Sequence, residues 1–318
     1  MDSVESGSLL VRTMASLLSE SGTTSLMRPG DDELRFYASA GPMTDLQHIQ
    51  AAGLPDDPAG LITIIQGLIL HRFWAETYGV VVPANREGEL QIRSAESMIE
   101  RLMEIDPKPL GEPRPAEMRF LGNCRHFSTL TTALLRRADV PSRARCGFAN
   151  YFDEGKWVDH WVVEYWNGNR WVMLDSQIDA FQREAIVLGA DPADLPSGYF
   201  LTAGDAWLKC RDGVEDADRF GILDMWGKWF IRGNVARDLA ALNKVEMLPW
   251  DGWGALAGAV GTASDDGFVD DIAALTLSDD LPAIRHRYES DPALRVPSKI
   301  TSYLATGPLE MEVAELLT

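Results

Sequence analysis

The sequence predicts an α+β fold, in which one helix precedes and packs on a small antiparallel sheet. Apolar residues recur at helical spacing over 123–137, and three strand-like segments follow at 143–152, 157–166 and 170–175. Asn167-Gly168-Asn169 joins the last two segments as a hairpin turn, because Asn and Gly tolerate positive φ. Since the helix does not alternate with the strands, a parallel α/β unit is excluded.

The first 110 residues are predicted to be mainly helical. Helical spacing indicates a helix over 8–18 and another that starts at Ser94. The apolar run after Asp57-Pro58 predicts one long buried helix over 59–78, with the proline near its first turn. Four prolines and a glycine over 106–115 then indicate a connector.

The whole chain, 1–318, is expected to form one composite domain, because the connector is too short to demand a boundary. Its parts are a helical N-terminal region (1–110), a core (111–182) and a C-terminal extension (183–318) that lines the cleft. The extension is predicted to hold an aromatic-rich helix over 221–242, a glycine-rich loop over 250–267, and short helices at 281–288 and 309–317. The acidic stretch 265–271 indicates a solvated face or a helix start.

The composition is that of a folded, acidic protein. Apolar residues make up 46 %, and 29 Lys+Arg against 48 Asp+Glu give a net charge of −19. This excess argues against nucleic-acid binding and against docking on anionic lipid, since both need a basic surface. The longest apolar run, 61–70, is about half the length that a bilayer requires, so no membrane span is expected.

Cysteine usage and the N-terminal residues predict a cytoplasmic protein. Cys124, Cys146 and Cys210 are too few for a disulfide framework, and the acidic start lacks the cationic region of a secretory signal. In a reducing compartment each cysteine is either a small core residue or a reactive thiol. Cys146 and Cys210 are predicted to be core residues.

Cys124 is the candidate nucleophile because it lies at the predicted start of a helix. Free backbone N–H groups and the helix dipole there favour the thiolate and can receive an oxyanion. His160 and Asp175 lie at similar distances on either side of the hairpin turn, so strand pairing places them within a few ångströms. The carboxylate can orient the imidazole, which can pair with the thiolate and protonate a leaving group.

Three motifs occur along the chain in a characteristic order: Gly122-Asn123-Cys124, Asp159-His160-Trp161-Val162 and Trp171-Val172-Met173-Leu174-Asp175. In this order they resemble the transglutaminase-like superfamily, whose papain-like core carries a Cys-His-Asp triad. The resemblance covers about a fifth of the chain, 121–179. It implies Cys124 as nucleophile, His160 as general base and acid, and Asp175 as the orienting carboxylate. It also implies a nucleophile helix packed on an antiparallel sheet.

Four further residues are predicted to contact substrate: Asn123, His126, Trp161 and Gln177. His126 is two residues from the candidate nucleophile and therefore faces another side of the helix, which makes it a poor base. A side-chain donor to the oxyanion is left open between Gln66, Asn123 and Trp161. No cofactor and no metal are expected, because the histidines and cysteines lack zinc-ligand spacing and nothing resembles a calcium loop.

The leading hypothesis is cysteine-dependent acyl transfer through an acyl-thioester on Cys124. The donor would be an amide or thioester, carried by a small molecule, a peptide or a carrier protein. Water as acceptor would make the chain an amidase or peptidase, and an amine would make it an acyltransferase.

Two other classes are weighed against this hypothesis. Half of the ten tryptophans lie within 207–253, where they would form an aromatic wall for a ligand. The alternative is therefore a catalytically inactive, papain-like binding or scaffold protein that uses this tryptophan-rich half. A third hypothesis, a redox sensor that pairs Cys124 with Cys146, predicts disulfide formation under mild oxidant.

Overall fold

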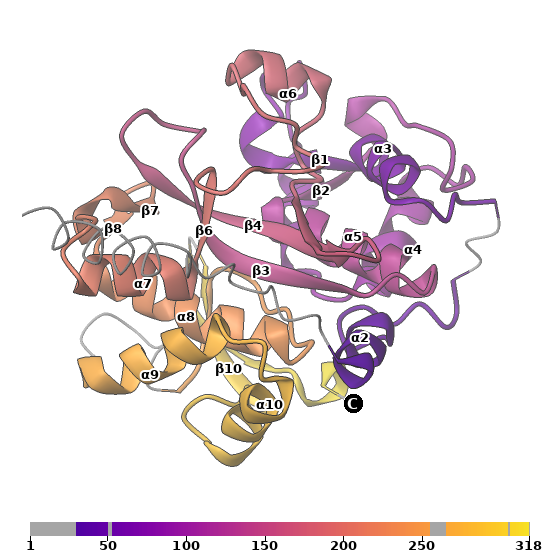
Figure 1. The fold of residues 1–318 in the computed structure, drawn as a ribbon. Helices are drawn as coiled ribbons and strands as arrows, with labels where there is room; N and C mark the ends of the chain where they lie inside the picture. The colour runs from indigo at the N-terminus through magenta and orange to yellow at the C-terminus, as the bar shows by residue number, and fades with distance from the viewer. Residues whose placement is uncertain (1–29, 50–52, 255–264, 305, 318) are drawn as a thin grey trace, which may run out of the picture.

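The predicted hairpin lies at the centre of a six-stranded sheet in the computed structural model, which describes residues 30–49, 53–254, 265–304 and 306–317. The six strands are β3 (Ser142–Ala149), β4 (Trp157–Trp166), β5 (Trp171–Leu174), β6 (Phe200–Thr202), β7 (Phe220–Ile222) and β8 (Met225–Trp226). Antiparallel β3 and β4 run through the middle of the molecule (Figure 1). Strand β5 pairs with β4 across the expected turn, where Gly168 has a φ of 91°. The α+β prediction is confirmed.

Helix α5 (Cys124–Arg137) packs against β3 and β4 and begins where the sequence predicted. Asn123 caps it: the side-chain oxygen accepts the backbone N–H of His126, whose ring in turn accepts the backbone N–H of Asn123. Phe127 and Leu130 lie in the apolar cluster below the sheet. The cap therefore fixes Cys124 as the first helical residue.

The N-terminal region contains less helix than predicted. Its elements are α2 (Asp31–Ala38), α3 (Pro58–Leu68), β1 (Ile69–His71), η1 (Arg72–Trp74), η2 (Ala84–Gln91), α4 (Ala95–Ile105), η3 (Ala116–Met118) and β2 (Phe120–Gly122). The start of α4 is confirmed, since the Ser94 hydroxyl accepts the backbone N–H of Ser97 at 3.2 Å. The helix expected over 8–18 lies outside the described residues.

The long helix expected over 59–78 is wrong, because α3 ends at Leu68 and the chain continues as β1. Strand β1 pairs in parallel with β2, which places His71 opposite Gly122. A short apolar run fits a buried strand as well as a buried helix. The partner strand, some fifty residues later in the chain, decides between them.

The C-terminal extension consists of α6 (Ala180–Ala185), α7 (Ala203–Arg211), η4 (Ala217–Arg219), α8 (Lys228–Leu242), β9 (Asp251–Gly252), α9 (Asp266–Thr276), α10 (Leu281–Ser290), β10 (Lys299–Leu304), β11 (Gly307–Glu312) and η5 (Ala314–Leu316). The helix predicted at 281–288 is confirmed as α10, and Asp265 caps α9, so the acidic stretch is a helix start. The expected helix over 221–242 begins only at Lys228, because its first residues extend the sheet. Part of the predicted loop over 250–267 lies outside the described residues.

The helix predicted over 309–317 is also wrong. This segment contains β11, which pairs with β10 along its whole length, and only the short turn η5 follows it. As with β1, pairing with another strand decides the structure, although the apolar residues of the segment have helical spacing.

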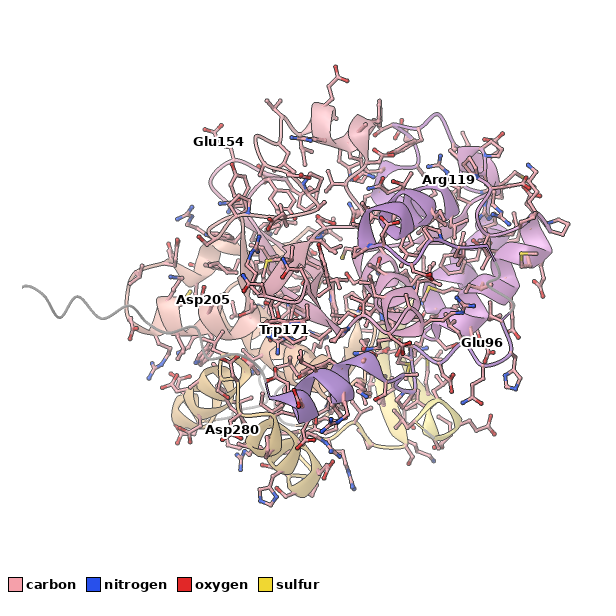
Figure 2. The ribbon with its side chains drawn as sticks, turned by 45° about the vertical axis from the view of Figure 1, so that its right-hand side comes forward. Glu96, Arg119, Glu154, Trp171, Asp205 and Asp280 are labelled. Atoms are coloured by element: carbon pink, nitrogen blue, oxygen red, sulfur yellow. The ribbon has the colours of Figure 1, made fainter. Side chains whose placement is uncertain are left out.

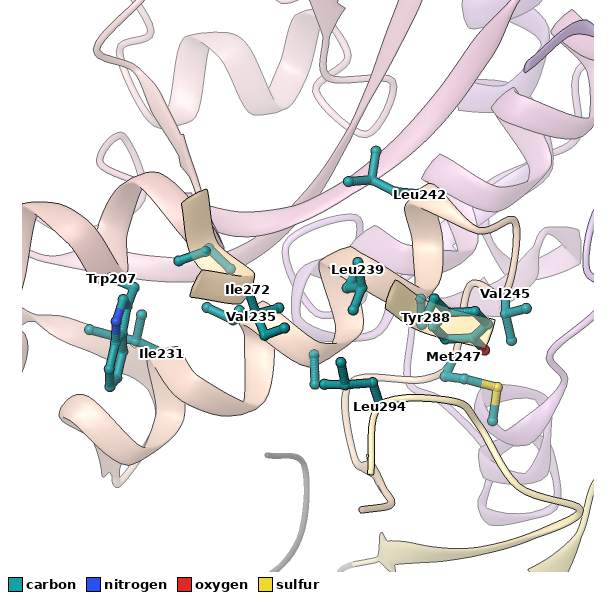
Figure 3. Packing of buried hydrophobic residues seen from close by; sticks show 14 of the residues in the cluster. Trp207, Ile231, Val235, Leu239, Leu242, Val245, Met247, Ile272, Tyr288 and Leu294 are labelled. Carbon is teal, nitrogen blue, oxygen red and sulfur yellow. The ribbon is translucent and has the colours of Figure 1, made fainter. Parts of the chain in front are cut away.

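The largest apolar cluster forms around α8, which is buried on nearly every side. Figure 3 shows Val235 and Leu239 of α8 with Ile272 of α9, Tyr288 of α10 and Leu294. Tyr37 and Met43 from the N-terminal region belong to the same cluster. The described ends of the chain therefore share one core with the sheet.

Carboxylates such as Glu154 and Asp280 are exposed at the surface, in keeping with the strongly acidic composition (Figure 2). Among the helices that the structure describes, none has both the length and the apolar content needed to cross a bilayer.

A buried ion pair attaches α8 to the edge of β3. The contact is bidentate: Arg145 Nη2 and Nε donate to the two carboxylate oxygens of Asp238 at 2.8 and 3.0 Å. Asp238 Oδ1 also accepts the backbone N–H of Cys146 at 2.9 Å. Because both charges are removed from water, each depends on the other for its stability in the interior.

Replacing Asp238 with Asn is expected to lower the free energy of unfolding by about 3 kcal/mol, because the buried Arg145 charge loses a partner. Urea denaturation followed by circular dichroism measures the loss. Asp194→Asn, which removes the exposed partner of Arg170, is the matched control and should cost less than about 1 kcal/mol. Equal losses in the two variants would contradict a structural role for the buried pair.

Candidate active site

The thiol of Cys124 lies at the N-terminus of α5, on the floor of a cavity. The residue is 7 % exposed. The first backbone N–H groups of a helix have no intrahelical acceptor, and the helix dipole places partial positive charge there. This environment can stabilise negative charge on an oxygen bound next to the sulfur.

His160, on β4, and Asp175, directly after β5, form a buried contact in which imidazole Nε2 lies 2.7 Å from carboxylate Oδ2. The hydroxyl of Tyr151 donates to the same oxygen at 2.7 Å, and the backbone N–H of Gln177 donates to Oδ1 at 3.0 Å. Both carboxylate oxygens therefore have hydrogen-bond donors, which compensates for their removal from water.

The charge state of His160 follows from its neighbours. Burial opposes the imidazolium, but the carboxylate of Asp175 and the neighbouring thiol of Cys124 together raise its pKa to about 10. Because Nε2 pairs with Asp175, Nδ1 is the ring nitrogen that is left for the thiol. The three side chains thus form one continuous series, with the imidazole between thiol and carboxylate.

The cavity above these residues has a volume of about 850 Å³. Most of its wall is apolar, and the C-terminal extension supplies much of it through Ile222, Leu223, Met225, Trp229, Phe230 and Trp250. Phe73 and Phe152 come from earlier in the chain. An apolar cavity with a few polar groups at one end is typical of a small-molecule or acyl-group site.

The structure separates the four residues expected to contact substrate. Asn123 and Gln177 line the cavity. His126 and Trp161 are not among the residues that line it, and their contact with substrate stays a prediction. His126 is fully buried, with Nδ1 in the helix cap and Nε2 at 3.0 Å from the carbonyl oxygen of Ile92. Trp161 is 1 % exposed and packs in a cluster with Cys124 and Cys146.

Of the three side chains considered as donors to an oxyanion, only Asn123 lines the main cavity. The amide of Gln66 donates to the carbonyl oxygen of Ile178 at 3.0 Å and lies outside the main cavity. The indole N–H of Trp161 is buried without a hydrogen-bond partner and does not reach the cavity surface. Asn123 remains at the cavity wall.

Sequence reasoning missed His71, which lines the cavity together with Cys124 and His160. The reason is the incorrect helix over 59–78, which hid the strand β1 and its pairing with β2. A signal was present in the β-branched and apolar residues before His71, but it did not exclude a helix.

The two remaining cysteines differ from Cys124 in their surroundings. Cys146 is fully buried, and this burial raises its pKa well above the usual value, while burial raises the pKa of Cys210 to about 11. Within the described part of the chain, no group of three histidine, cysteine or acidic side chains is placed to hold a metal ion.

One known protein family matches the central part of the chain. Residues 90–176 match the model of the transglutaminase-like superfamily, and this range contains Cys124, His160 and Asp175. The core is therefore transglutaminase-like, as the three motifs indicated.

More distant comparisons add little. No curated protein is significantly similar to the chain. A solved structure of a proposed cysteine protease from Cytophaga hutchinsonii is 16 % identical, with a TM-score of 0.29. The alignment covers 49 % of this chain and 45 % of that one, so it defines neither the fold nor the activity here.

Replacing Asp175 with Asn is expected to remove the main cause of the raised His160 pKa. In the folded wild type His160 stays charged up to about pH 10, whereas an unfolded histidine titrates near 6.5. Stabilisation from the charged imidazole is therefore complete below pH 6.5 and is lost as the pH rises toward 10. The difference in free energy of unfolding between wild type and variant, measured in urea, should narrow across this window. A constant or widening difference would contradict the ion pair.

Proposed function

We propose that the chain is a cysteine enzyme that transfers acyl groups through an acyl-thioester on Cys124. The observation that carries this proposal is the buried series of thiol, imidazole and carboxylate that opens into a cavity. The match to the transglutaminase-like superfamily supports it, because that match covers all three residues. Cys124 is the proposed nucleophile, His160 the proton carrier and Asp175 the residue that positions and charges His160.

In the proposed first step the sulfur of Cys124 forms a bond to the carbonyl carbon, and the carbonyl π electrons move to oxygen. When the tetrahedral species collapses, the bond to the leaving nitrogen or sulfur breaks. His160 donates its proton to that leaving atom and becomes neutral. Neutral His160 then removes a proton from the acceptor that attacks the acyl-thioester, and the paired thiolate and imidazolium return.

The cavity wall favours a donor with a large apolar or aromatic group. Trp229 and Trp250, two of the tryptophans expected to form an aromatic wall, line the cavity, whereas Trp207 and Trp253 are buried in the core. A small molecule, a peptide side chain or an acyl group on a carrier protein would each meet this requirement. Hydrolysis and transfer to an amine share the same first half, and exclusion of water from the cavity would favour transfer.

Limiting iodoacetamide at pH 6 is expected to alkylate Cys124 first, because the His160 imidazolium stabilises an anion at its sulfur. Cys146 and Cys210 should react far more slowly, since burial raises their pKa values. Peptide mapping by mass spectrometry measures the three rates, and His160→Ala should abolish the preference. Slow and equal labelling of all three thiols would instead favour the inactive binding protein.

The activated ester 4-nitrophenyl phenylacetate is expected to acylate wild type with a stoichiometric burst of 4-nitrophenol, read by absorbance. Cys124→Ala should lose the burst, and His160→Ala should slow it by about 10²–10⁴-fold, because no side chain then accepts the proton of the Cys124 thiol. Cys210→Ala, remote from the cavity, is the control that should keep it. A burst that survives in Cys124→Ala would refute the acyl-thioester.

A further inference from the structure

His71 lines the same cavity as the proposed nucleophile although it belongs to a different part of the chain. Strand β1 pairs in parallel with β2, and the register sets His71 opposite Gly122, two residues before Cys124. The side chain lines the same cavity as Cys124 and His160. His71 also interacts electrostatically with His160 and Asp175, which places it at the same end of the cavity as these two residues.

The local backbone fixes which ring nitrogen of His71 carries the proton. His71 is the N-cap of the short helix η1, and its Nδ1 accepts the backbone N–H of Phe73 at 3.2 Å. Because Nδ1 is the acceptor in this bond, the proton of the neutral ring lies on Nε2.

The imidazole of His71 is uncharged over the range in which the proposed chemistry operates. Burial, together with the charge of nearby His160, lowers the pKa of His71 to about 3. Two histidines of one cavity are thus held in opposite charge states. A neutral imidazole is a hydrogen-bond donor that keeps its proton, unlike a general acid.

The Nε2–H group of His71 has no hydrogen-bond partner among the described residues, although the residue is only 8 % exposed. Capping of η1 requires Nδ1 alone and gives no reason for a free donor at Nε2. Nε2 is not among the fully buried side-chain atoms that lack a partner, so it is accessible from the cavity that His71 lines. An unpartnered N–H at a cavity wall can donate to an acceptor atom of a bound molecule.

We propose that Nε2–H of His71 donates a hydrogen bond to the carbonyl oxygen of the acyl donor and stabilises the oxyanion that forms there. The proposal rests on the acyl-transfer function proposed above. As the bond from the Cys124 sulfur to carbon forms, the π electrons move to oxygen, and His71 holds that negative charge without giving up its proton. The backbone N–H groups at the start of α5 supply the remaining donors.

Two variants test this role because each replaces the hydrogen-bonding function of a different ring nitrogen of His71. His71→Asn retains an acceptor near Nδ1 for the Phe73 N–H but removes the donor at Nε2. His71→Gln can place an amide N–H near the position of Nε2. Two rates are measured for each: alkylation of Cys124 by iodoacetamide, which forms no oxyanion, and the burst with 4-nitrophenyl phenylacetate, which does.

His71→Asn is expected to slow the acylation burst by about 10²–10³-fold while alkylation changes less than about twofold, since only acylation develops charge on a carbonyl oxygen. His71→Gln should recover at least part of the burst rate. Equal slowing of both rates by His71→Asn would overturn the proposal, because it would show that His71 only positions the thiol and His160. An unchanged burst would overturn it too.

Wild type alone provides a measurement that does not depend on the variants folding. With ¹⁵N-labelled histidine, NMR should show His71 as the Nε2-protonated neutral ring, and its Nε2–H resonance should move downfield when phenylacetaldehyde adds to Cys124. A ring protonated on Nδ1, or a resonance that does not move, would refute the proposal. Failure of the proposed function looks different: wild type would then undergo alkylation at Cys124 but no burst with the ester.

Discussion

The charge on a buried histidine is the constraint on which the rest of the site depends. His160 can stay protonated inside the protein only because Asp175 and Cys124 flank its ring. The carboxylate of Asp175 in turn accepts hydrogen bonds from the hydroxyl of Tyr151 and the backbone N–H of Gln177, which compensate for its removal from water. A single carboxylate therefore links strand β4 to the segments that follow β3 and β5.

The C-terminal extension encloses the site formed by Cys124, His160 and Asp175, because it supplies much of the cavity wall. Helix α8 is attached to β3 through Asp238 and Arg145, and it carries Phe230 and Gly233 at the cavity wall. Asn234, on the same helix, donates to the buried carboxylate of Asp159 next to His160 at 2.6 Å. Apolar walls above a charged floor strengthen every electrostatic interaction at that floor, because they keep water away from it.

The cavity also shows how one residue type acquires two different properties. His160 has acidic and thiol partners and is held as a cation. His71 is held neutral because burial and the charge of His160 lower its pKa more than Asp175 raises it. The two rings are coupled, since protonation of one disfavours protonation of the other. Divergent pKa values of neighbouring groups are the usual way in which one site combines a proton carrier with a fixed donor.

The sequence by itself determined the features that depend on residues close along the chain. The Asn123 cap, the turn at 167–169 and the spacing of His160 and Asp175 about that turn are local, and the structure has them where the sequence predicted. Tertiary structure decided what depends on partners distant in sequence. The runs before His71 and after Gly307 became strands because other strands pair with them. His126 and Trp161 turned away from the cavity, and His71 entered it, because packing, and not spacing, sets the direction of a side chain.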